Sequence, residues 1–423
     1  MGAFFLIFAG LLASGIPIAL TLGIAGTAYL YLSGNGMMVL MLPQRMMAGI
    51  DQFVLMTIPL FLLAGALMNV GGVTDRIVHF ARAMVGHRRG GMSSVSILSA
   101  GFFAGISGSA TAEASALGSI LIPTMSRQGM PAAYAGALIA VASLMGPIIP
   151  PSITMIIYGV LSGTSIGQLF LAGVVPGICI AGGLLIYASW RAKRDGFPVT
   201  PRLPGRDRWA ATVRTLPALI LPAIILVGIK GGIFTPTEAA AVAVAYALVI
   251  GFIYRDLTLK AVWNALIATT LVSASILFIT SMASIVSFVF TLEQVPQHIA
   301  DLVLQITDHP LMILLLLNIF LLVLGMFLEP ISILILTMPI LLKFQALIGM
   351  DPVQFGTVVV LNVVIGMATP PVGILLFIAS AISGEPVTRV IREALPMIAI
   401  CITILAAVAL IPALALFVPK TLF

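Results

Sequence analysis

The stretch FFAGISGSATAEASALGSILIP, residues 102–123, places a carboxylate, Glu113, among small and hydroxylated residues. Five of the seven residues from Gly105 to Thr111 are Gly, Ser or Thr, whereas the sequence on either side is strongly apolar. A carboxylate at depth in an apolar segment is expensive and usually functional. The stretch therefore predicts a polar turn inside a hydrophobic environment.

The composition of the whole chain identifies that environment. Of its 423 residues, 61% are hydrophobic and only 8% are charged, whereas a soluble domain carries about 25% charged residues. About 20 apolar residues make one membrane crossing, and the chain contains many such runs. We expect an all-α polytopic protein of the lipid bilayer with no nucleic-acid partner. We assign its net charge of +6 to basic loops on the cytoplasmic side.

Two apolar runs contain a polar interruption that leaves each half too short to cross the membrane. Residues 93–125 are interrupted by GISGSAT, and residues 311–342 by GMFLEPIS. Each run is expected to enter the membrane and return to the same face as a re-entrant hairpin. Irregular backbone at membrane depth is tolerated only where it is buried in protein or lines a wet cavity. Both hairpin tips should therefore point into the protein.

Two further runs contain proline pairs. Residues 131–163 contain GPIIPPS, and residues 353–384 contain GMATPPVG. Proline removes a backbone donor and clashes with the preceding turn, so a helix should unwind at each motif. Both runs are long enough to reach the far face, which predicts two discontinuous spanning helices.

These interruptions recur as a repeat. Four pairs of landmarks follow the same order, the first two pairs 216 residues apart and the others 220: Glu113 and Glu329, Pro123 and Pro339, Pro150 and Pro370, Pro176 and Pro396. A spanning run and an amphipathic helix, at 73–88 or 293–308, precede each hairpin. The sequence therefore predicts two structural repeats.

The positive-inside rule sets their orientation. The segments 73–91, 191–214 and 255–260 hold 13 of the 20 Lys and Arg residues and are expected in the cytoplasm. This places the N-terminus in the cytoplasm and the C-terminus in the periplasm. Five crossings then separate the hairpins, so the first hairpin enters from the cytoplasm and the second from outside. Inverted repeats with broken helices are typical of secondary transporters.

Unwound backbone at the tips and breaks offers oxygen ligands to Na⁺ as the coupling ion. A first cation site is predicted at Gly105, Ser107, Ser109, Gly146 and Pro147. A second, pseudo-symmetric site is predicted at Gly325, Met326, Gly366, Ala368 and Thr369. Between them, an anionic substrate is expected at Ser109, Thr111, Pro150 and Pro371, where the half-helix N-termini carry positive dipole ends. No other cofactor is expected.

Several residues have an alternative structural interpretation. Glu113 and Glu329 either contact an ion or cap the second half-helix of each hairpin. Asn318 is expected to form an interhelical hydrogen bond, and Asn362 is a weaker site candidate. The motifs GISG and GTSIG match the serine motifs of hydrolases, but no histidine lies in a spanning run to serve as base, so an enzyme is disfavoured. A passive channel does not account for the paired inverted hairpins.

The motifs GISGSATAEASALGSILIP, GPIIPPS and NVVIGMATPPVGILLF resemble the large membrane subunit of tripartite ATP-independent periplasmic (TRAP) transporters. The resemblance covers nearly the whole chain. The wider superfamily of elevator-type transporters shares the architecture, so a stand-alone Na⁺-coupled dicarboxylate carrier is the alternative. The Ser-Asn-Thr tip motif typical of those carriers is absent from both hairpins.

This resemblance implies a Na⁺-driven importer of organic acid anions, such as C4-dicarboxylates or sialic acids, in the bacterial inner membrane. Its implied partners are a periplasmic substrate-binding protein and a small four-helix membrane subunit, here a separate chain. It also implies an elevator mechanism, in which a transport domain slides against a scaffold. The expected division is 1–91 for scaffold helices and the first arm, 92–190 for the first part of the transport domain, 191–310 for the cytoplasmic loop, further scaffold helices and the second arm, and 311–423 for the second part of the transport domain with the C-terminal helix.

Overall fold

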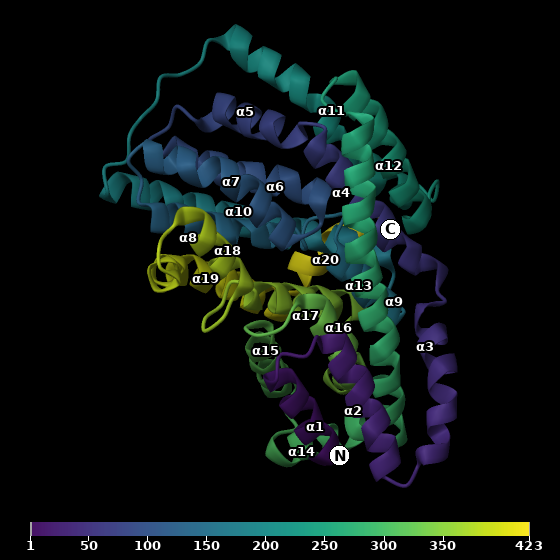
Figure 1. Cartoon of the computed structure of the whole chain (residues 1–423). Helices are drawn as coiled ribbons and strands as arrows, with labels where there is room; N and C mark the ends of the chain where they lie inside the picture. The colour runs from purple at the N-terminus through teal and green to yellow at the C-terminus, as the bar shows by residue number, and fades with distance from the viewer. Residues whose placement is uncertain (1, 423) are drawn as a thin grey trace.

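The computed structural model describes residues 2–422, and within that range the chain is helical throughout, with no strand. Seven of the helices in this part of the chain are long and apolar enough to cross a membrane. Figure 1 shows the long helix α13 (Leu259–Leu292) standing beside α2 (Ile18–Leu32) and α3 (Leu42–Ile50), while the other helices gather against its side. The fold is thus the predicted all-α membrane architecture.

The first repeat follows the predicted order of elements. It comprises α4 (Thr57–Val70), the amphipathic α5 (Val73–Val85), a hairpin of α6 (Gly91–Ser107) and α7 (Ala110–Arg127), a broken helix of α8 (Ala132–Ala142) with a 3-10 turn at Ser143–Met145 and α9 (Ile153–Ser162), and then α10 (Ile166–Arg194). The backbone unwinds between Met145 and Ile153, at GPIIPPS. Both the hairpin and the discontinuous helix are confirmed.

The second repeat passes through the same order. After α13 come the amphipathic α14 (Val295–Ile306), a hairpin of α15 (Pro310–Gly325) and α16 (Pro330–Ile348), a broken helix of α17 (Pro352–Gly366) and α18 (Ile374–Ser383), and then α19 (Val387–Leu410). Between the repeats lie α11 (Gly205–Lys230) and α12 (Pro236–Ile253), and α20 (Pro412–Leu422) ends the chain. The broken helix, α10, α11, α12 and α13 make five crossings between the hairpins, so the repeats are inverted.

The N-terminal run differs in detail from a single crossing. It forms α1 (Gly2–Ala13) and α2, which are 12 and 15 residues long. The chain turns before Pro17, which caps α2. Each helix is shorter than the roughly 20 residues of a full span. A break before Pro17 therefore separates two short helices that pack against each other.

One element was not predicted from the sequence. Residues 36–41 form a 3-10 helix, and α3 follows at once and packs along α13. Its Arg45 lies over the ring of Phe288 on α13, at 4.8 Å from the centroid. A helix of nine residues with one charged side chain is too short to form a long apolar run, so the apolar pattern of the sequence does not reveal it.

Small and hydroxylated residues hold α2, α4, α12 and α13 together. A methyl group at Gly26 of α2 would lie 2.7 Å from Cγ2 of Ile285 on α13, so the glycine permits close approach of the two helices. The hydroxyls of Thr57 on α4 and Thr237 on α12 share a buried hydrogen bond of 2.9 Å. In a membrane such contacts replace the hydrophobic driving force between helices.

The amphipathic helix α5 is fixed at both ends. At its start, Arg76 pairs with Asp256 at 2.6 Å and stacks on the ring of Tyr254 at 3.9 Å. Thr215 of α11 also donates a hydrogen bond of 3.0 Å to the carbonyl of Arg76. At its far end, the Gly86 carbonyl accepts from the Thr200 hydroxyl at 2.5 Å.

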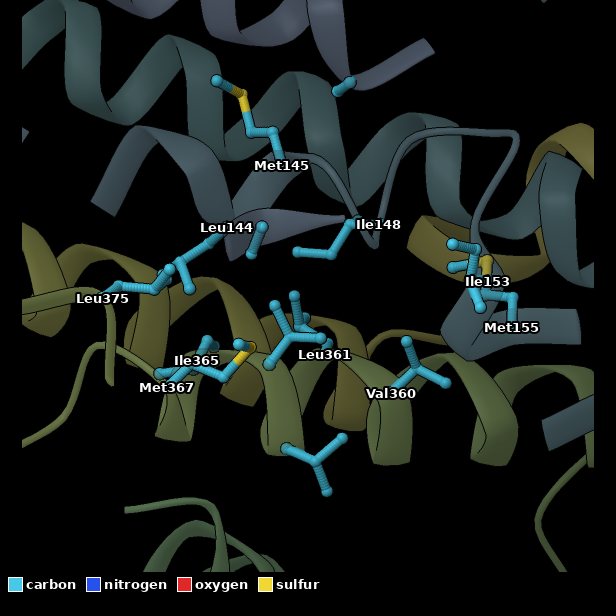
Figure 2. Close-up of a cluster of buried hydrophobic side chains, with 14 of the residues drawn as sticks. Leu144, Met145, Ile148, Ile153, Met155, Val360, Leu361, Ile365, Met367 and Leu375 are labelled. Atoms are coloured by element: carbon cyan, nitrogen blue, oxygen red, sulfur yellow. The ribbon is translucent and has the colours of Figure 1, made fainter. Parts of the chain in front are cut away.

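The two broken helices share one buried apolar cluster. Figure 2 shows Leu144 and Ile148 from the first break together with Leu361 and Ile365 from α17, and all four side chains are at most 1% exposed. Because side chains in such a cluster are closely packed, a change in the volume of one of them strains its neighbours. Segments about 220 residues apart are thereby joined, and each break is held in a fixed place.

Candidate functional site

Both hairpin tips and both helix breaks contribute to the wall of one small cavity. Its volume is about 90 Å³. Its polar side chains are Ser109 and Thr111 at the start of α7, Thr154 of α9 and Glu329 at the start of α16. Pro147 of the first break, Met367 of the second break, and Leu62, Val272 and Ile276 of α4 and α13 complete much of the wall. The predicted convergence of tips and breaks is therefore observed.

A second cavity of about 210 Å³ adjoins the first and shares Leu62, Ser109 and Val272 with it. It adds the polar side chains of Asn69, Ser107 and Thr269. No Lys, Arg or His contributes to either wall among residues 2–422. A bound anion would therefore rely on hydroxyls and on the N-termini of α7 and α16.

A compact set of hydrogen bonds forms the first hairpin tip. The Ser107 hydroxyl donates to the carbonyl of Ser109 and accepts from its N–H, both at 3.4 Å. Ser109 is the N-cap of α7: its hydroxyl accepts from the N–H of Ala112 at 3.5 Å and lies 3.2 Å from that of Thr111. Gly108 has φ +62°, and a methyl group there would lie 2.7 Å from the Pro151 carbonyl. Only glycine fits this turn without strain.

The serines of the hydrolase-like motifs have structural roles. Ser107 bonds only within the tip, and Ser165 of GTSIG caps α10 by accepting from the N–H of Gln168 at 3.5 Å. A serine nucleophile needs a base within hydrogen-bond reach. The hydrogen bonds of both serines thus serve the tip and the helix cap, and no partner in them is a base.

The first break lies directly against the first tip. A methyl group at Gly146 would lie 3.3 Å from the carbonyl oxygen of Ser109. The neighbouring Pro147 carbonyl accepts a hydrogen bond of 2.5 Å from Ser152, the N-cap of α9. The Pro150–Pro151 peptide is cis. A carbonyl oxygen has two lone pairs, so Pro147 retains one for a cation.

The second tip and break repeat this contact more tightly. A methyl group at Gly366 would lie 2.5 Å from the Cα of Gly325, so the two backbones touch. The N–H of Gly373 donates to the Met326 carbonyl at 3.2 Å. The Thr369 hydroxyl donates to the Ile365 carbonyl at 2.8 Å and keeps its lone pairs for a cation. The offsets of 216 and 220 residues that relate the landmarks also relate Ser109 to Gly325 and Gly146 to Gly366.

The two carboxylates of the hairpins occupy different environments. Glu113 lies within the first turn of α7, is 0% exposed and does not cap that helix. Its oxygen Oε2 faces the first break, 2.8 Å from where a methyl group on Gly146 would lie. Glu329 is the N-cap residue of α16, without a side-chain capping bond, and is exposed at the cavity. Capping, one of the two alternatives for these carboxylates, is absent at Glu113, and at Glu329 it is limited to the position of the residue.

The structure gathers most of the predicted ligands. Ser107, Ser109, Gly146 and Pro147 lie together at the first tip and break, whereas Gly105 lies farther from the turn, between Pro222 of α11 and the Pro150 carbonyl of the break. For the second set, Gly325 contacts Gly366, Met326 bonds into the break, and Ala368 and Thr369 form the turn after α17. Of the predicted substrate residues, Ser109 and Thr111 face the cavity. Pro150 is buried, Pro371 is exposed, and neither contributes to the wall.

The two asparagines are joined by two interhelical hydrogen bonds. The Asn362 side-chain nitrogen donates to the Asn318 side-chain oxygen at 2.7 Å and to its carbonyl at 2.9 Å, which ties α17 to α15. The expected role of Asn318 is confirmed. Asn362 shares that structural role and does not contribute to either cavity wall.

Four polar residues near the site were missed in the sequence. Asn69, Thr154 and Thr269 face the cavities, and Ser143 is buried beside the first break. A single hydroxyl or amide in an apolar helix usually bonds its own backbone or a neighbouring helix, so its presence alone gives no signal. Ser143 and Thr154 lie within one turn of the first predicted break, and that position could have identified them, whereas Asn69 and Thr269 lie on the uninterrupted α4 and α13 and have no such signal.

The chain is similar to known membrane transport proteins along nearly its whole length. The profile of the family described as "Tripartite ATP-independent periplasmic transporter, DctM component" matches residues 5–414. The chain belongs to this family. It is 38% identical to the sialic acid TRAP transporter large permease protein SiaM of Vibrio cholerae over 97% of this chain and 96% of that protein. It is 41% identical to the C4-dicarboxylate TRAP transporter large permease protein DctM of Pseudomonas aeruginosa, over 88% of this chain and 87% of that protein.

Two further similarities concern a longer relative and a solved structure. The isethionate TRAP transporter permease protein DctMQ of Oleidesulfovibrio alaskensis is 37% identical over 97% of this chain, which covers 65% of that longer protein. The solved YdaH transporter of Alcanivorax borkumensis superposes with a TM-score of 0.62 over 92% of this chain and 90% of its own, at 14% identity. At that identity the second similarity concerns the fold alone. The chain is the large, multi-pass membrane component of a bacterial TRAP transporter.

Proposed function

We propose that this protein imports an organic acid anion into the bacterial cell by Na⁺ symport with an elevator motion. The observation that carries the proposal is the convergence of both hairpin tips and both helix breaks on one cavity against α4 and α13. Such a midplane site, built from discontinuous helices of inverted repeats, is the usual arrangement of a secondary transporter. Sialic acid, C4-dicarboxylate and 2,3-diketo-L-gulonate in the names of relatives set the candidate substrate classes.

The tips and breaks fit a hard monovalent cation. Their polar atoms are oxygens from hydroxyls and carbonyls: Ser107, Ser109 and Pro147 in one repeat, Thr369 and the break carbonyls in the other. Oxygen ligands of this kind suit hard cations, whereas nitrogen or sulfur ligands suit transition metals. Na⁺ entering the cell contributes about 2.3 kcal/mol per charge for each 100 mV of membrane potential. Two ions would offset the inward movement and concentration of one monoanion.

Uptake into proteoliposomes tests the symport. The complex is reconstituted with a candidate substrate-loaded binding protein outside, and uptake is followed with an inward Na⁺ gradient or with choline in place of Na⁺. Uptake is expected only with Na⁺. Equal uptake in choline contradicts Na⁺ coupling, whichever organic acid is used.

The packing also supports a moving domain. A methyl group at Gly65 of α4 would lie 3.2 Å from the Ile106 carbonyl, and one at Gly105 would lie 2.7 Å from Cγ of Pro222 on α11. Glycines thus allow the first hairpin to approach α4 and α11 of the proposed scaffold closely, and contacts without an interlocking side chain at these two positions favour sliding. Helix α5 connects the two parts.

A pair of engineered disulfides tests the elevator motion. Replacement of Gly105 and Pro222 by Cys links the hairpin to α11, where a Cβ at Gly105 lies 3.3 Å from that of Pro222. The matched control is Gly26→Cys with Ile285→Cys, inside the proposed scaffold, where the corresponding distance is 3.7 Å. Both distances are near those of natural disulfides. Cys179 and Cys401 are first replaced by Ala.

Oxidation should stop uptake in the first pair, and reduction should restore it, whereas the scaffold pair should remain active when linked. The single Gly105→Cys variant separates the crosslink from the substitution. A linked Gly105–Pro222 pair with undiminished uptake contradicts sliding at this boundary.

The family also supplies proposed partners. As the large component of a tripartite system, the chain is expected to require a periplasmic binding protein and a small four-helix membrane subunit supplied as a separate chain. Co-purification with the small subunit, and uptake that depends on the binding protein, test both partners. Uptake of free substrate by this chain alone would favour the stand-alone carrier. A cytoplasmic N-terminus and a periplasmic C-terminus are checked with terminal reporter fusions.

A further inference from the structure

A group of basic side chains without counter-charges gathers around the turn between α5 and α6. Burial and the nearby charges of Arg202, Arg208 and Arg88 lower the pKa of the His87 imidazole, so these arginines lie close to it. None of the three takes part in the ion pairs formed among residues 2–422. We call these four residues the basic cluster. Because like charges at short range disfavour one another, the cluster calls for an anion.

Two nitrogens of the basic cluster are buried without a hydrogen bond, Nδ1 of His87 and Nε of Arg208. Buried polar atoms in proteins nearly always have a partner, and an orphaned one commonly marks a missing water or ion. A guanidinium group has only donors, so the missing partner of Arg208 is an acceptor. Several guanidinium groups facing one point match the oxygens of a phosphate, which they bind in pairs.

The one carboxylate between residues 196 and 214 does not supply this acceptor. Asp207 lies in the first turn of α11, directly before Arg208, and forms no ion pair. Consecutive side chains on a helix point about 100° apart, so Asp207 and Arg208 project from different faces of α11. The acceptor must therefore come from outside the chain.

Backbone hydrogen bonds hold the two segments of the basic cluster together. The Gly86 carbonyl accepts from the Thr200 hydroxyl at 2.5 Å, and the Gly90 N–H donates to the Pro198 carbonyl at 3.2 Å. Figure 1 shows the loop after α10 passing the end of α5 on its way to the start of α11. The arginines of both segments are thus presented together at a fixed place.

Exposed apolar side chains beside the basic cluster mark a membrane surface. Trp209, which follows Arg208, is 70% exposed, and Val199 is 59% exposed. Tryptophan is enriched where the hydrocarbon of a membrane meets water, at the level of the lipid headgroups. The positive-inside rule assigns this side of the protein to the cytoplasm. The position thus favours a phosphate that belongs to a lipid over one dissolved in water.

We propose that the basic cluster binds the phosphate of an anionic phospholipid at the cytoplasmic surface of the membrane. Arg88, Arg202 and Arg208 pair with the phosphate oxygens, and Trp209 packs against the adjoining part of the lipid. The headgroup neutralises the cluster. It also ties the turn that leads into the first hairpin to the segment that leads into α11.

The test measures lipid binding without transport. The full-length chain in a neutral detergent is melted while phosphatidylglycerol replaces phosphatidylcholine at a constant total of lipid. A ligand that binds the folded state raises the Tm according to its affinity and concentration, so the wild-type Tm should rise with the phosphatidylglycerol fraction. A basic residue at an anionic surface contributes about 1 kcal/mol, or about fivefold in affinity. Each single Arg→Gln variant of the cluster should lose about this factor, and the triple variant about 100-fold.

A matched control separates the basic cluster from the general attraction of a basic face. Arg127→Gln, Lys260→Gln and Arg392→Gln together remove the same charge from exposed positions that form no ion pair. This control should keep the wild-type affinity for phosphatidylglycerol. The triple variant of the cluster should melt no lower than the wild type in phosphatidylcholine alone, because it removes mutual repulsion. Arginines that served only packing would lower the Tm equally in both lipids.

A third arm identifies the source of the phosphate. Sodium phosphate is added to the wild type in phosphatidylcholine, with sodium chloride at the same ionic strength as its reference. The Tm should not differ between the two salts. A rise with sodium phosphate as large as that with phosphatidylglycerol refutes the lipid and assigns the cluster to a soluble phosphate.

Three further outcomes overturn the proposal. A wild-type Tm that is equal in the two lipids refutes the site. A triple variant of the basic cluster whose affinity stays within about twofold of the wild type refutes it too, as does an equal loss of affinity in the control. If the triple variant does not fold, Arg202→Gln decides, because Arg202 lies exposed in the loop before α11, and unchanged affinity there refutes the site.

Discussion

The first hairpin turns within two residues, Gly108 and Ser109, whereas the second takes four, from Met326 to Glu329. The landmarks Glu113 and Glu329 keep their spacing of 216 residues, yet α7 begins one turn earlier in its repeat than α16 does. Pro330 explains the difference. Proline at the first helical position has no N–H, and the residue before it is held in extended backbone, as Glu329 is, at φ −70° and ψ 142°.

The matching position in the first repeat is Ala114, which lets the helix continue back to Ala110. Glu113 is therefore drawn into a helical turn and buried against the first break, while Glu329 stays outside its helix at the cavity. A repeat preserved in sequence spacing can thus place the same residue type in two different chemical environments. The comparison of the two hairpins is tested by substitutions with graded effects.

The largest loss of stability is expected where the second hairpin tip meets the second break, because the backbones of Gly325 and Gly366 touch there. Gly366→Ala places a methyl group 2.5 Å from the Cα of Gly325, and overpacking of this kind costs about 1–3 kcal/mol. The Tm in detergent should fall clearly. The matched control is Gly182→Ala in α10, where a methyl group meets nothing within 4 Å and the Tm should hold or rise. An unchanged Tm for Gly366→Ala would show that the two helices can separate freely.

The next effect compares the two proposed cation sites. Ser107→Ala and Thr369→Ala each remove one candidate ligand hydroxyl while leaving the tip or break backbone in place. Each is expected to raise the Na⁺ concentration for half-maximal uptake by about tenfold, equal to roughly 1.4 kcal/mol. The Tm in choline should change little. Wild-type Na⁺ dependence in either variant removes that residue from the ligand set.

A smaller effect is expected for the asparagine pair found only in the second repeat. Asn362→Ala removes two hydrogen bonds between α17 and α15. Interhelical hydrogen bonds in membranes contribute about 0.6 kcal/mol on average and up to about 1.7. The Tm should decrease modestly, with Na⁺ dependence unchanged. A large change in Na⁺ affinity would instead assign Asn362 to the site.

The smallest effect is expected at Glu329, in a comparison of the N-cap residues of the two hairpins. Ser109→Ala removes a hydroxyl that accepts from Ala112, and loss of such a cap costs about 0.5–2 kcal/mol. Glu329→Ala removes a side chain that makes no capping bond and should change the stability by less than about 0.5 kcal/mol. Thermal unfolding of both variants in choline makes the comparison. A larger loss at Glu329 than at Ser109 would reverse the assignment of the caps.

Much of the fold follows from the sequence because its decisive features are local. GISGSAT, GPIIPPS and their counterparts interrupt apolar runs, and helix interruption by glycine and proline depends on backbone chemistry alone. Their constant spacing then gives the repeat, and the count of crossings gives its inversion. The same reasoning places Ser107, Ser109 and Gly146 near one another.

The rest depends on which neighbour each side chain meets. Pro330 is visible in the sequence. Its effect, a later start of α16 than of α7 within the repeat, is evident only when the first residues of both helices are known. Gly105 has the same composition signal as Gly108 yet faces Pro222 of α11. The proline pairs mark the breaks, but Pro150 turns inward and Pro371 outward, because burial is decided by the helices packed around them.

Helix α5 gives the molecule a mechanical link of fixed length. At about 1.5 Å per residue, its 13 residues span about 20 Å. Its start is held through Arg76 by the loop after α12 and by α11, and its end is held through Gly86 by the segment that follows α10. A rigid rod pivoting at its first turn by about 30° carries its other end about 10 Å along an arc. The first hairpin, joined to that end, would therefore tilt as it travels, and the length of α5 would set how far one stroke can reach.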